Sequence, residues 1–221
     1  MKSMLVVGIG RFGIHLIKEL VKLGNEVMVI NDREDGIEEI IPIVNDVIIG
    51  DCTKKDVLNS VGVGNFDVCF VCVGTNFQAS LETTFLLKEL GAKCVVSRVS
   101  EDVQEKFLLR NGADEIVYPE RQEAERAAVK YSSESIFDFF ELSNNVSIYE
   151  TALIPQWIGK SLSELNFRAR YRANVLAVKD ADGTVTPVND ADRTFREGEH
   201  LLVMSENEDF KKLIRDIEKY S

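Results

Sequence analysis

Short apolar runs alternate with segments of helical spacing over the first half of the chain. The apolar runs are continuous rather than alternating, which indicates parallel strands covered on both faces. With right-handed crossovers, this order predicts a doubly wound α/β fold, a Rossmann-like parallel sheet, over residues 1–118. Strands are expected at 4–7, 27–30, 46–49, 68–73, 94–96 and 115–118. Helices are expected at 11–23, 34–44, 56–61, 77–90 and 103–109.

The pattern changes after residue 118. A charged stretch of helical spacing covers 120–131, and the apolar stretch 135–140 follows it, as in a bridge that packs on another surface. Beyond it, strands are predicted at 146–153, 175–178 and 201–204, with a turn at Asp182-Gly183 and a closing helix over 210–217. Residues 141–221 are therefore expected to form a small α+β domain with an antiparallel sheet.

Composition narrows the class of protein. Of the 221 residues, 45% are hydrophobic and 29% charged, the balance of a globular chain. The formal net charge of −11 is spread along the chain, which excludes binding to nucleic acid through counterion release. Four cysteines are too few for a disulfide scaffold, and we expect neither a secretory leader nor a membrane span. A cytoplasmic, reducing environment is expected.

A glycine-rich turn follows the first predicted strand. The sequence from Gly8 to Gly13, G-I-G-R-F-G, fits the dinucleotide-binding pattern. Gly8 permits the tight turn, Gly10 lets the backbone approach a pyrophosphate, and Gly13 lets the helix pack closely on the sheet. The free N–H groups at the start of the helix favour phosphate. In this strand–turn–helix context the motif predicts a nucleotide site, with Arg11 and Phe12 at its edge.

The residue type at the end of the second strand helps to distinguish which nucleotide is bound. The ribose-binding acid expected about 20 residues after the loop falls on Asn31, with Asp32 next to it. Asn31 can bind a ribose hydroxyl without charge, Asp32 takes that role if the strand end is shifted by one residue, and Arg33 can meet a phosphate. A merely solvated strand end is the alternative. The pattern predicts an adenine nucleotide and leaves ATP/ADP and NAD/NADH open.

The carboxyl ends of the other parallel strands are expected to line the same cleft. Asp51 can reach an adenine amino group, and Arg98 can meet phosphate. Helix caps and a surface ion pair are the alternatives for these positions. The candidate contacts are Asp51, Cys52, Thr53, Gly74, Thr75, Asn76 and Arg98.

No catalytic set accompanies the predicted cleft. The chain lacks the common nucleophile and metalloprotease motifs, and Cys69 and Cys72 lie three apart in a strand, on opposite faces. The hypothesis is a non-enzymatic, ligand-sensing regulator. An NAD(P)-dependent oxidoreductase and a sensor for a transporter of another ion are the alternatives.

Seven stretches together resemble one family, the RCK (KTN) regulatory subunits of potassium channels and transporters of the KtrA/TrkA type. They are VVGIGRFG at 6–13, GNEVMVI at 24–30, GDCT at 50–53, DVCFVCVGTN at 67–76, LLKEL at 86–90, NGADEIVYPE at 111–120, and residues 161–178. The resemblance implies a nucleotide-binding domain at 1–118, crossover and dimerisation helices at 119–140, and a C-terminal domain at 141–221. It also implies homodimers assembled into an octameric ring on the inner face of the membrane, where nucleotide gates a potassium-translocating subunit of the KtrB/TrkH type.

The resemblance also assigns residues. Gly8, Gly10 and Gly13 would cradle phosphates, and Arg11 would reach phosphate, including across a dimer. Glu120 resembles a carboxylate that binds a divalent cation, Mg or Ca, near the phosphates. The family positions that line the nucleotide correspond to Asp51, Thr75 and Asn76, and Asn31 stands where most members have an acid.

Some members bind cyclic di-AMP in the C-terminal domain, in a region that corresponds to residues 166–172. If that segment is extended, its alternate arginines share one face and suit two phosphates, with an adenine stacked on Tyr171. A charged strand face paired with nearby carboxylates is the alternative. The candidate residues are Asn166, Arg168, Arg170 and Tyr171.

Overall fold

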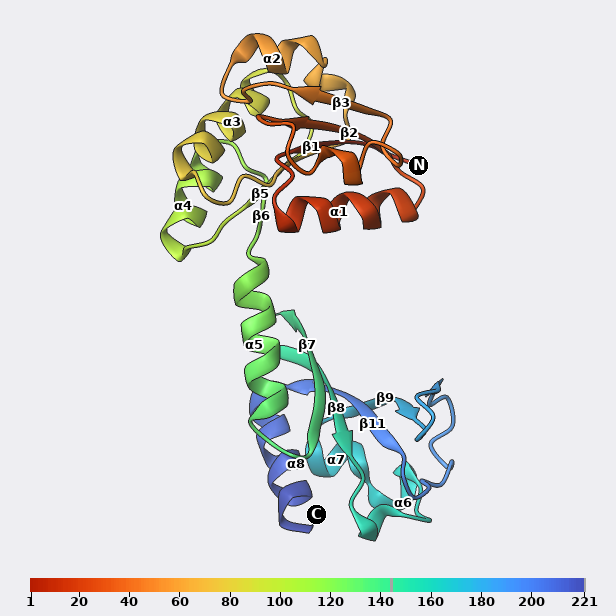
Figure 1. Cartoon of the computed structure of the whole chain (residues 1–221). Helices are drawn as coiled ribbons and strands as arrows, with labels where there is room; N and C mark the ends of the chain where they lie inside the picture. Colours follow the sequence, from red (N-terminus) through yellow and green to blue (C-terminus); the bar gives the residue numbers. More distant parts are fainter. Residues whose placement is uncertain (144, 221) are drawn as a thin grey trace. The chain divides into compact units, whose positions relative to one another are not determined.

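The computed structural model describes residues 1–143 and 145–220, so positions 144 and 221 of the predicted C-terminal domain lie outside the described residues. The chain divides into two compact units, Met1–Arg121 and Gln122–Ser221 (Figure 1). Within the described residues, no helix is both long and apolar enough to cross a bilayer.

The first unit is built on a six-stranded parallel sheet of order β3-β2-β1-β4-β5-β6. This order confirms the predicted doubly wound fold. The strands are β1 (Ser3–Val7), β2 (Glu26–Asn31), β3 (Asp46–Ile49), β4 (Val68–Val71), β5 (Val95–Arg98) and β6 (Glu115–Val117). The helices are α1 (Arg11–Lys22), α2 (Lys55–Ser60), α3 (Phe77–Glu89) and α4 (Asp102–Arg110).

Helices cover both faces of this sheet (Figure 1). Ile17 of α1 packs on Val6 and Val29 on one face. Leu58 of α2 and Leu87 of α3 pack on the other. Because neither face meets water, the strands carry the continuous apolar runs from which they were predicted.

The predicted helix at 34–44 is wrong. The structure has a short 3-10 turn, Ile37–Glu39, in its place. Gly36 precedes that turn with φ of 81°, in the left-handed region, and Pro42 cannot donate a helical hydrogen bond. Ile37 and Ile40 of the segment are buried in the core, and Val44 packs against it partly exposed.

The predicted helices at 119–140 are confirmed only in their first part. Helix α5 covers Pro119–Tyr131, but Ile136–Ser143 forms strand β7. β7 pairs antiparallel with β8 (Val146–Ala152), and Phe139 opposes Tyr149, with their ring centroids 5.3 Å apart. Cross-strand aromatic pairing of this kind stabilises a strand, whereas the apolar run by itself does not distinguish strand from helix.

The second unit holds a five-stranded antiparallel sheet of order β10-β9-β11-β8-β7, as the sequence predicted for an α+β domain. Its other elements are α6 (Leu162–Leu165), α7 (Phe167–Tyr171), β9 (Asn174–Lys179), β10 (Val185–Pro187), β11 (His200–Glu206) and α8 (Asn207–Tyr220). The sequence pattern missed β10, whose three residues are all exposed.

Helix α8 closes one face of this sheet. Its buried residues Phe210, Leu213 and Ile217 recur at helical spacing, and the Phe210 ring stacks on Tyr149 with centroids 3.4 Å apart. Burying each such side chain stabilises the unit by about 2 kcal/mol. Trp157 lies in the same core, 2% exposed.

A carboxylate joins three strands in this sheet. Glu150 of β8 accepts hydrogen bonds from Lys179 Nζ at 2.9 and 3.0 Å and lies 2.8 Å from His200 Nδ1. Burial by itself would raise the pKa of Glu150. The hydrogen bonds from His200 and Lys179, with the charge of Lys179, hold the pKa below its ordinary value of 4.5.

Glu150→Gln is therefore expected to lower the free energy of unfolding of the second unit by about 1–2 kcal/mol at neutral pH. Because the folded-state pKa of Glu150 lies below the unfolded one, its stabilisation is present above pH 4.5 and is lost as the pH falls through the folded value. Urea unfolding followed by the fluorescence of Trp157, the single tryptophan, measures this at several pH values.

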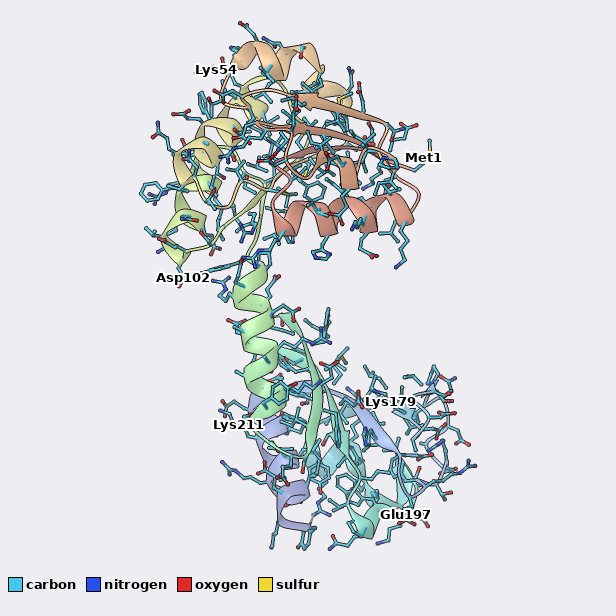
Figure 2. All side chains as sticks on the ribbon, in the orientation of Figure 1. Met1, Lys54, Asp102, Lys179, Glu197 and Lys211 are labelled. Atoms are coloured by element: carbon cyan, nitrogen blue, oxygen red, sulfur yellow. The ribbon has the colours of Figure 1, made fainter. Side chains whose placement is uncertain are left out.

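The matched control is Glu197→Gln, at an exposed carboxylate of the same unit. Figure 2 marks both Lys179 and Glu197. We expect no effect of this control beyond about 0.5 kcal/mol. A deficit of Glu150→Gln that stays constant down to about pH 3.5 would contradict the depressed pKa.

Candidate functional site

The glycine loop joins β1 to α1 with a geometry that only glycine fits at two positions. Gly8 has φ of +94°, in the left-handed region. A Cβ on Gly13 would lie 2.3 Å from the carbonyl oxygen of Gly8, so a side chain there collides with the backbone. At Gly10, a Cβ would meet no atom of the described residues within 4 Å. The open space at Gly10 is where a pyrophosphate can approach the start of α1.

Asn31 at the end of β2 braces this loop. Its Oδ1 accepts the backbone N–H of Ile9 at 3.1 Å, and its Nδ2 donates to the carbonyl of Arg33 at 2.8 Å. The side chain is buried, with only one N–H and one lone pair left for a ligand. Asp32 and Arg33 are exposed, with Arg33 Nε 3.6 Å from Asp32 Oδ2. Asp32 is thus the freer acceptor for a ribose hydroxyl at this strand end.

The turn after β3 orders a carboxylate. Asp51 Oδ1 accepts the hydroxyl of Thr53 at 2.6 Å and its backbone N–H at 2.9 Å. These hydrogen bonds hold the pKa of Asp51 below its ordinary value. Asp51 does not cap the following helix, because the N-cap of α2 is Lys54. It therefore stays ionised and exposed, as an acceptor for an amino group or hydroxyl requires.

The alternative of a helix cap holds for Asn76. Its side chain accepts the backbone N–H of Ala79 at 3.1 Å and begins α3. Thr75 beside it is exposed. This cap fixes the course of the chain from β4 to α3.

Arg98 and Glu120 meet at the carboxyl edge of the sheet. Arg98 Nη2 donates to Glu120 Oε1, and the Arg98 side chain is only 15% exposed. Burial by itself would raise the pKa of Glu120. A hydrogen bond from its own backbone N–H, the hydrogen bond from Arg98, and the charges of Arg98 and Arg11 hold that pKa below its ordinary value. A carboxylate at this position is therefore ionised.

These residues surround one cleft of about 1070 Å³, a volume suited to a nucleotide. The cleft lies at the carboxyl ends of β1 and β4, where the strand order reverses. Of the predicted contacts in the first unit, all but Gly13 line it: Gly8, Gly10, Arg11, Phe12, Asn31, Asp32, Arg33, Asp51, Cys52, Thr53, Gly74, Thr75, Asn76, Arg98 and Glu120. Gly13 does not line the cleft. Because it has no Cβ, it leaves room for the carbonyl group of Gly8, which does.

The motif search missed several lining residues. His15 of α1 is exposed and lines the cleft. It lies four residues after Arg11 on α1, and this spacing would have placed both on one helix face. Gln78 and Glu82 of α3 also line it, joined by a 2.8 Å hydrogen bond from Gln78 Nε2.

The two cysteines of β4 and its end point to opposite faces of the sheet, as predicted, and both are buried in its cores. Cys69 packs on the face of α2 and α3, and Cys72 on the opposite face. Burial raises the pKa of each thiol to about 12, so neither is a thiolate at neutral pH.

The divalent cation predicted at Glu120 stays a prediction. Among residues 1–143 and 145–220 there is no group of three or more His, Cys, Asp or Glu side chains arranged to hold a metal ion. A divalent cation at Glu120 therefore needs further oxygen ligands, such as phosphates.

The extended segment expected at 166–172 is wrong. Asn166 adopts the left-handed region, with φ of 46°, and α7 follows it. On a helix, Arg168 and Arg170 point to different sides. Tyr171 is 1% exposed and donates its hydroxyl to Asp216 at 2.9 Å, so its ring cannot stack on an adenine. The predicted alternative, pairing with a carboxylate, holds for Arg170, whose Nη2 lies 2.7 Å from Asp216.

Two of the four residues predicted to bind cyclic di-AMP line the same cleft. Asn166 and Arg168 line a smaller cleft of about 380 Å³ with Phe167 and Asn174. Arg170 and Tyr171 do not line it.

The class of protein that this geometry defines has a Rossmann-type domain with a glycine-loop cleft, followed by a small α+β domain with an antiparallel sheet. Residues 4–119 match the family model of the TrkA-N domain, and residues 155–217 match that of the TrkA-C domain. The chain is 40% identical over 178 residues to the Ktr system potassium uptake protein C of Bacillus subtilis (strain 168), covering 80% of each chain. It is 32% identical over 212 residues to the Ktr system potassium uptake protein A of the same organism, covering 96% of this chain and 95% of that protein.

This chain therefore belongs to the family of Ktr-type potassium uptake proteins with TrkA-N and TrkA-C domains. Among solved structures, the GsuK RCK domain superposes with a TM-score of 0.67 at 19% identity, covering 96% of this chain. The chain spans 46% of that structure's length, and the similarity shows the fold. The relatives are potassium uptake proteins rather than enzymes, which decides against the oxidoreductase alternative.

Proposed function

We propose that this chain is a cytoplasmic, nucleotide-binding regulatory subunit of a potassium uptake system, in which the bound nucleotide controls a membrane pore formed by another protein. The observation that carries the proposal is the glycine-loop cleft at the point where the strand order reverses. The names of its relatives, Ktr system potassium uptake proteins A and C, supply the ion and the transport system.

The ligand we propose is an adenine nucleotide. Gly10 leaves room for the pyrophosphate, Arg11 at the first position of α1 supplies positive charge, and Asp32 accepts a ribose hydroxyl. A solved structure of similar fold, with a TM-score of 0.66 at 19% identity, is described as the GsuK channel bound to NAD. Asn31 bears no charge, and Asp32 beside it supplies the acceptor for the ribose, so ATP and ADP stand beside NAD and NADH as the nucleotides to be tested.

The assembly we propose is a homodimer that forms an octameric ring beneath a potassium-translocating subunit of the KtrB/TrkH type. If the ring has two conformations, a nucleotide that binds one of them more tightly shifts the ring towards that conformation. A Mg or Ca ion held between Glu120 and the phosphates would strengthen binding of the more highly charged nucleotide. Cyclic di-AMP stays a prediction for the second unit, now carried by Asn166 and Arg168 alone.

Calorimetric titration of the purified chain with ATP, ADP, NAD, NADH and cyclic di-AMP tests the ligand. We expect ATP and ADP to bind at the first unit. Potassium uptake in transport-deficient cells that express the pore subunit, with and without this chain, tests the transport role. Uptake of another ion in place of potassium would identify a different transporter. A protein that binds no adenine nucleotide would overturn the proposal.

A further inference from the structure

Arg98 is held on two sides and unsatisfied on a third. Its Nη2 donates to Glu120, and its Nη1 lies so close to Gly74 that a Cβ there would be 1.6 Å away. Its Nε is buried and has no hydrogen-bond partner among the residues that the structure describes. The guanidinium therefore rests against the backbone of Gly74 with a donor that Glu120 does not satisfy.

A buried donor without an acceptor is unfavourable, and an arginine has five N–H donors in a planar fork. A phosphate offers several acceptor oxygens and forms bidentate pairs with that fork. Arg98 lines the same cleft as Gly10 and Arg11, so a phosphate bound on the glycine loop is attracted by the positive charge of this arginine. Glu120 and a phosphate carry the same sign of charge, and they compete for one guanidinium.

We propose that Arg98 is an exchange residue: it binds Glu120 when the cleft holds no anion, and it releases Glu120 to bind the phosphates of a nucleotide. The inference rests on the proposed function, because it needs a nucleotide in the first unit. It assigns Arg98 to phosphate binding and gives Glu120 two alternative partners.

The exchange has a consequence for regulation. Glu120 is the second residue of α5. When a nucleotide occupies the cleft, the start of that helix therefore loses its hydrogen bond to Arg98. The next residue, Arg121, is bound separately, to Asp102 at 3.3 Å and over the ring of Tyr118 at 4.9 Å, and Figure 2 marks Asp102. A released Glu120 carboxylate becomes available to a cation only after nucleotide has bound. Nucleotide and cation affinities are then linked reciprocally.

Binding of ADP in the presence of EDTA tests the exchange without any cation at Glu120. The full-length wild type is compared with Glu120→Gln, Arg98→Gln and the double variant by calorimetry. We expect Glu120→Gln to bind ADP about fivefold more tightly than the wild type, because nothing charged has to leave Arg98. In the Arg98→Gln background, the same change is expected to alter affinity less than about twofold.

Glu82→Gln is the matched control, because Glu82 is another carboxylate of the same cleft. Its effect is expected to be equal in both backgrounds. Arg98→Lys, which keeps the charge without the fork, serves as a second background, and circular dichroism verifies folding of every variant. If Glu120→Gln tightens ADP binding equally with and without Arg98, or weakens it with Arg98 present, the exchange is wrong and the nucleotide site stands. If the wild type binds no ADP, both proposals fail.

Discussion

Gly13→Ala is expected to abolish nucleotide binding and to destabilise the first unit by about 2–3 kcal/mol. The added Cβ would lie 2.3 Å from the carbonyl oxygen of Gly8, and no side-chain rotation relieves this contact, because the backbone fixes the position of both atoms. The loop must open or α1 must move off the sheet, and either change displaces the N–H groups that would bind phosphate. Thermal unfolding and titration with ADP measure the two effects.

Gly10→Ala separates binding from folding. A Cβ on Gly10 meets no atom within 4 Å, and its φ of −60° suits alanine. We expect its stability to stay within about 0.5 kcal/mol of the wild type. Its affinity for ADP is expected to fall at least about tenfold, since the methyl group occupies the space of the pyrophosphate. Unchanged ADP binding by Gly10→Ala would show that phosphate is not bound at this loop.

Arg11→Ala is expected to abolish the difference that ATP and ADP make to the shape of the ring. Arg11 is exposed at the first position of α1 and lines the cleft, and its charge already acts on Glu120. The γ-phosphate adds negative charge at the end of the nucleotide, where an arginine on the rim binds it by charge-assisted hydrogen bonds. Affinity for ATP is expected to fall about tenfold or more, and affinity for ADP less than about threefold.

Small-angle scattering of the assembled protein with each nucleotide measures this effect. Lys18→Ala is the control on the same helix, because Lys18 pairs with Glu39 and does not line the cleft. Scattering curves of Arg11→Ala that still separate ATP from ADP would show that another group senses the γ-phosphate.

The parallel sheet could be predicted from the sequence because burial on both faces requires each strand to be a continuous run of apolar residues. Strand β3, Asp46–Ile49, was expected at those same residues, and the other five strands of the sheet differ by one or two residues at their ends. Short apolar stretches elsewhere in the chain do not distinguish a strand from a helix. β7 was misjudged because the period of its apolar run is ambiguous over a few residues, and the helix at 34–44 because Gly36 and Pro42 interrupt its helical spacing.

The cleft was predicted well for a topological reason. Parallel strands deliver their carboxyl ends to one edge, so loops far apart in sequence, such as those of Gly8 and Gly74, meet there. Side chains on helices are harder to predict, because helix rotation decides which of them face the cleft. His15 and Glu82 were missed for this reason.

The order of apolar runs and the spacing of three glycines were sufficient to derive a doubly wound domain with a glycine-rich loop at the start of its first helix, since both follow from local backbone requirements and burial. Contacts between distant segments were not derivable in this way. Asn31 braces the glycine loop, Tyr171 is buried against Asp216, and Arg98 meets Glu120 across 22 positions of chain. Each of these polar groups has several possible partners along the chain, and packing of the folded units selects one.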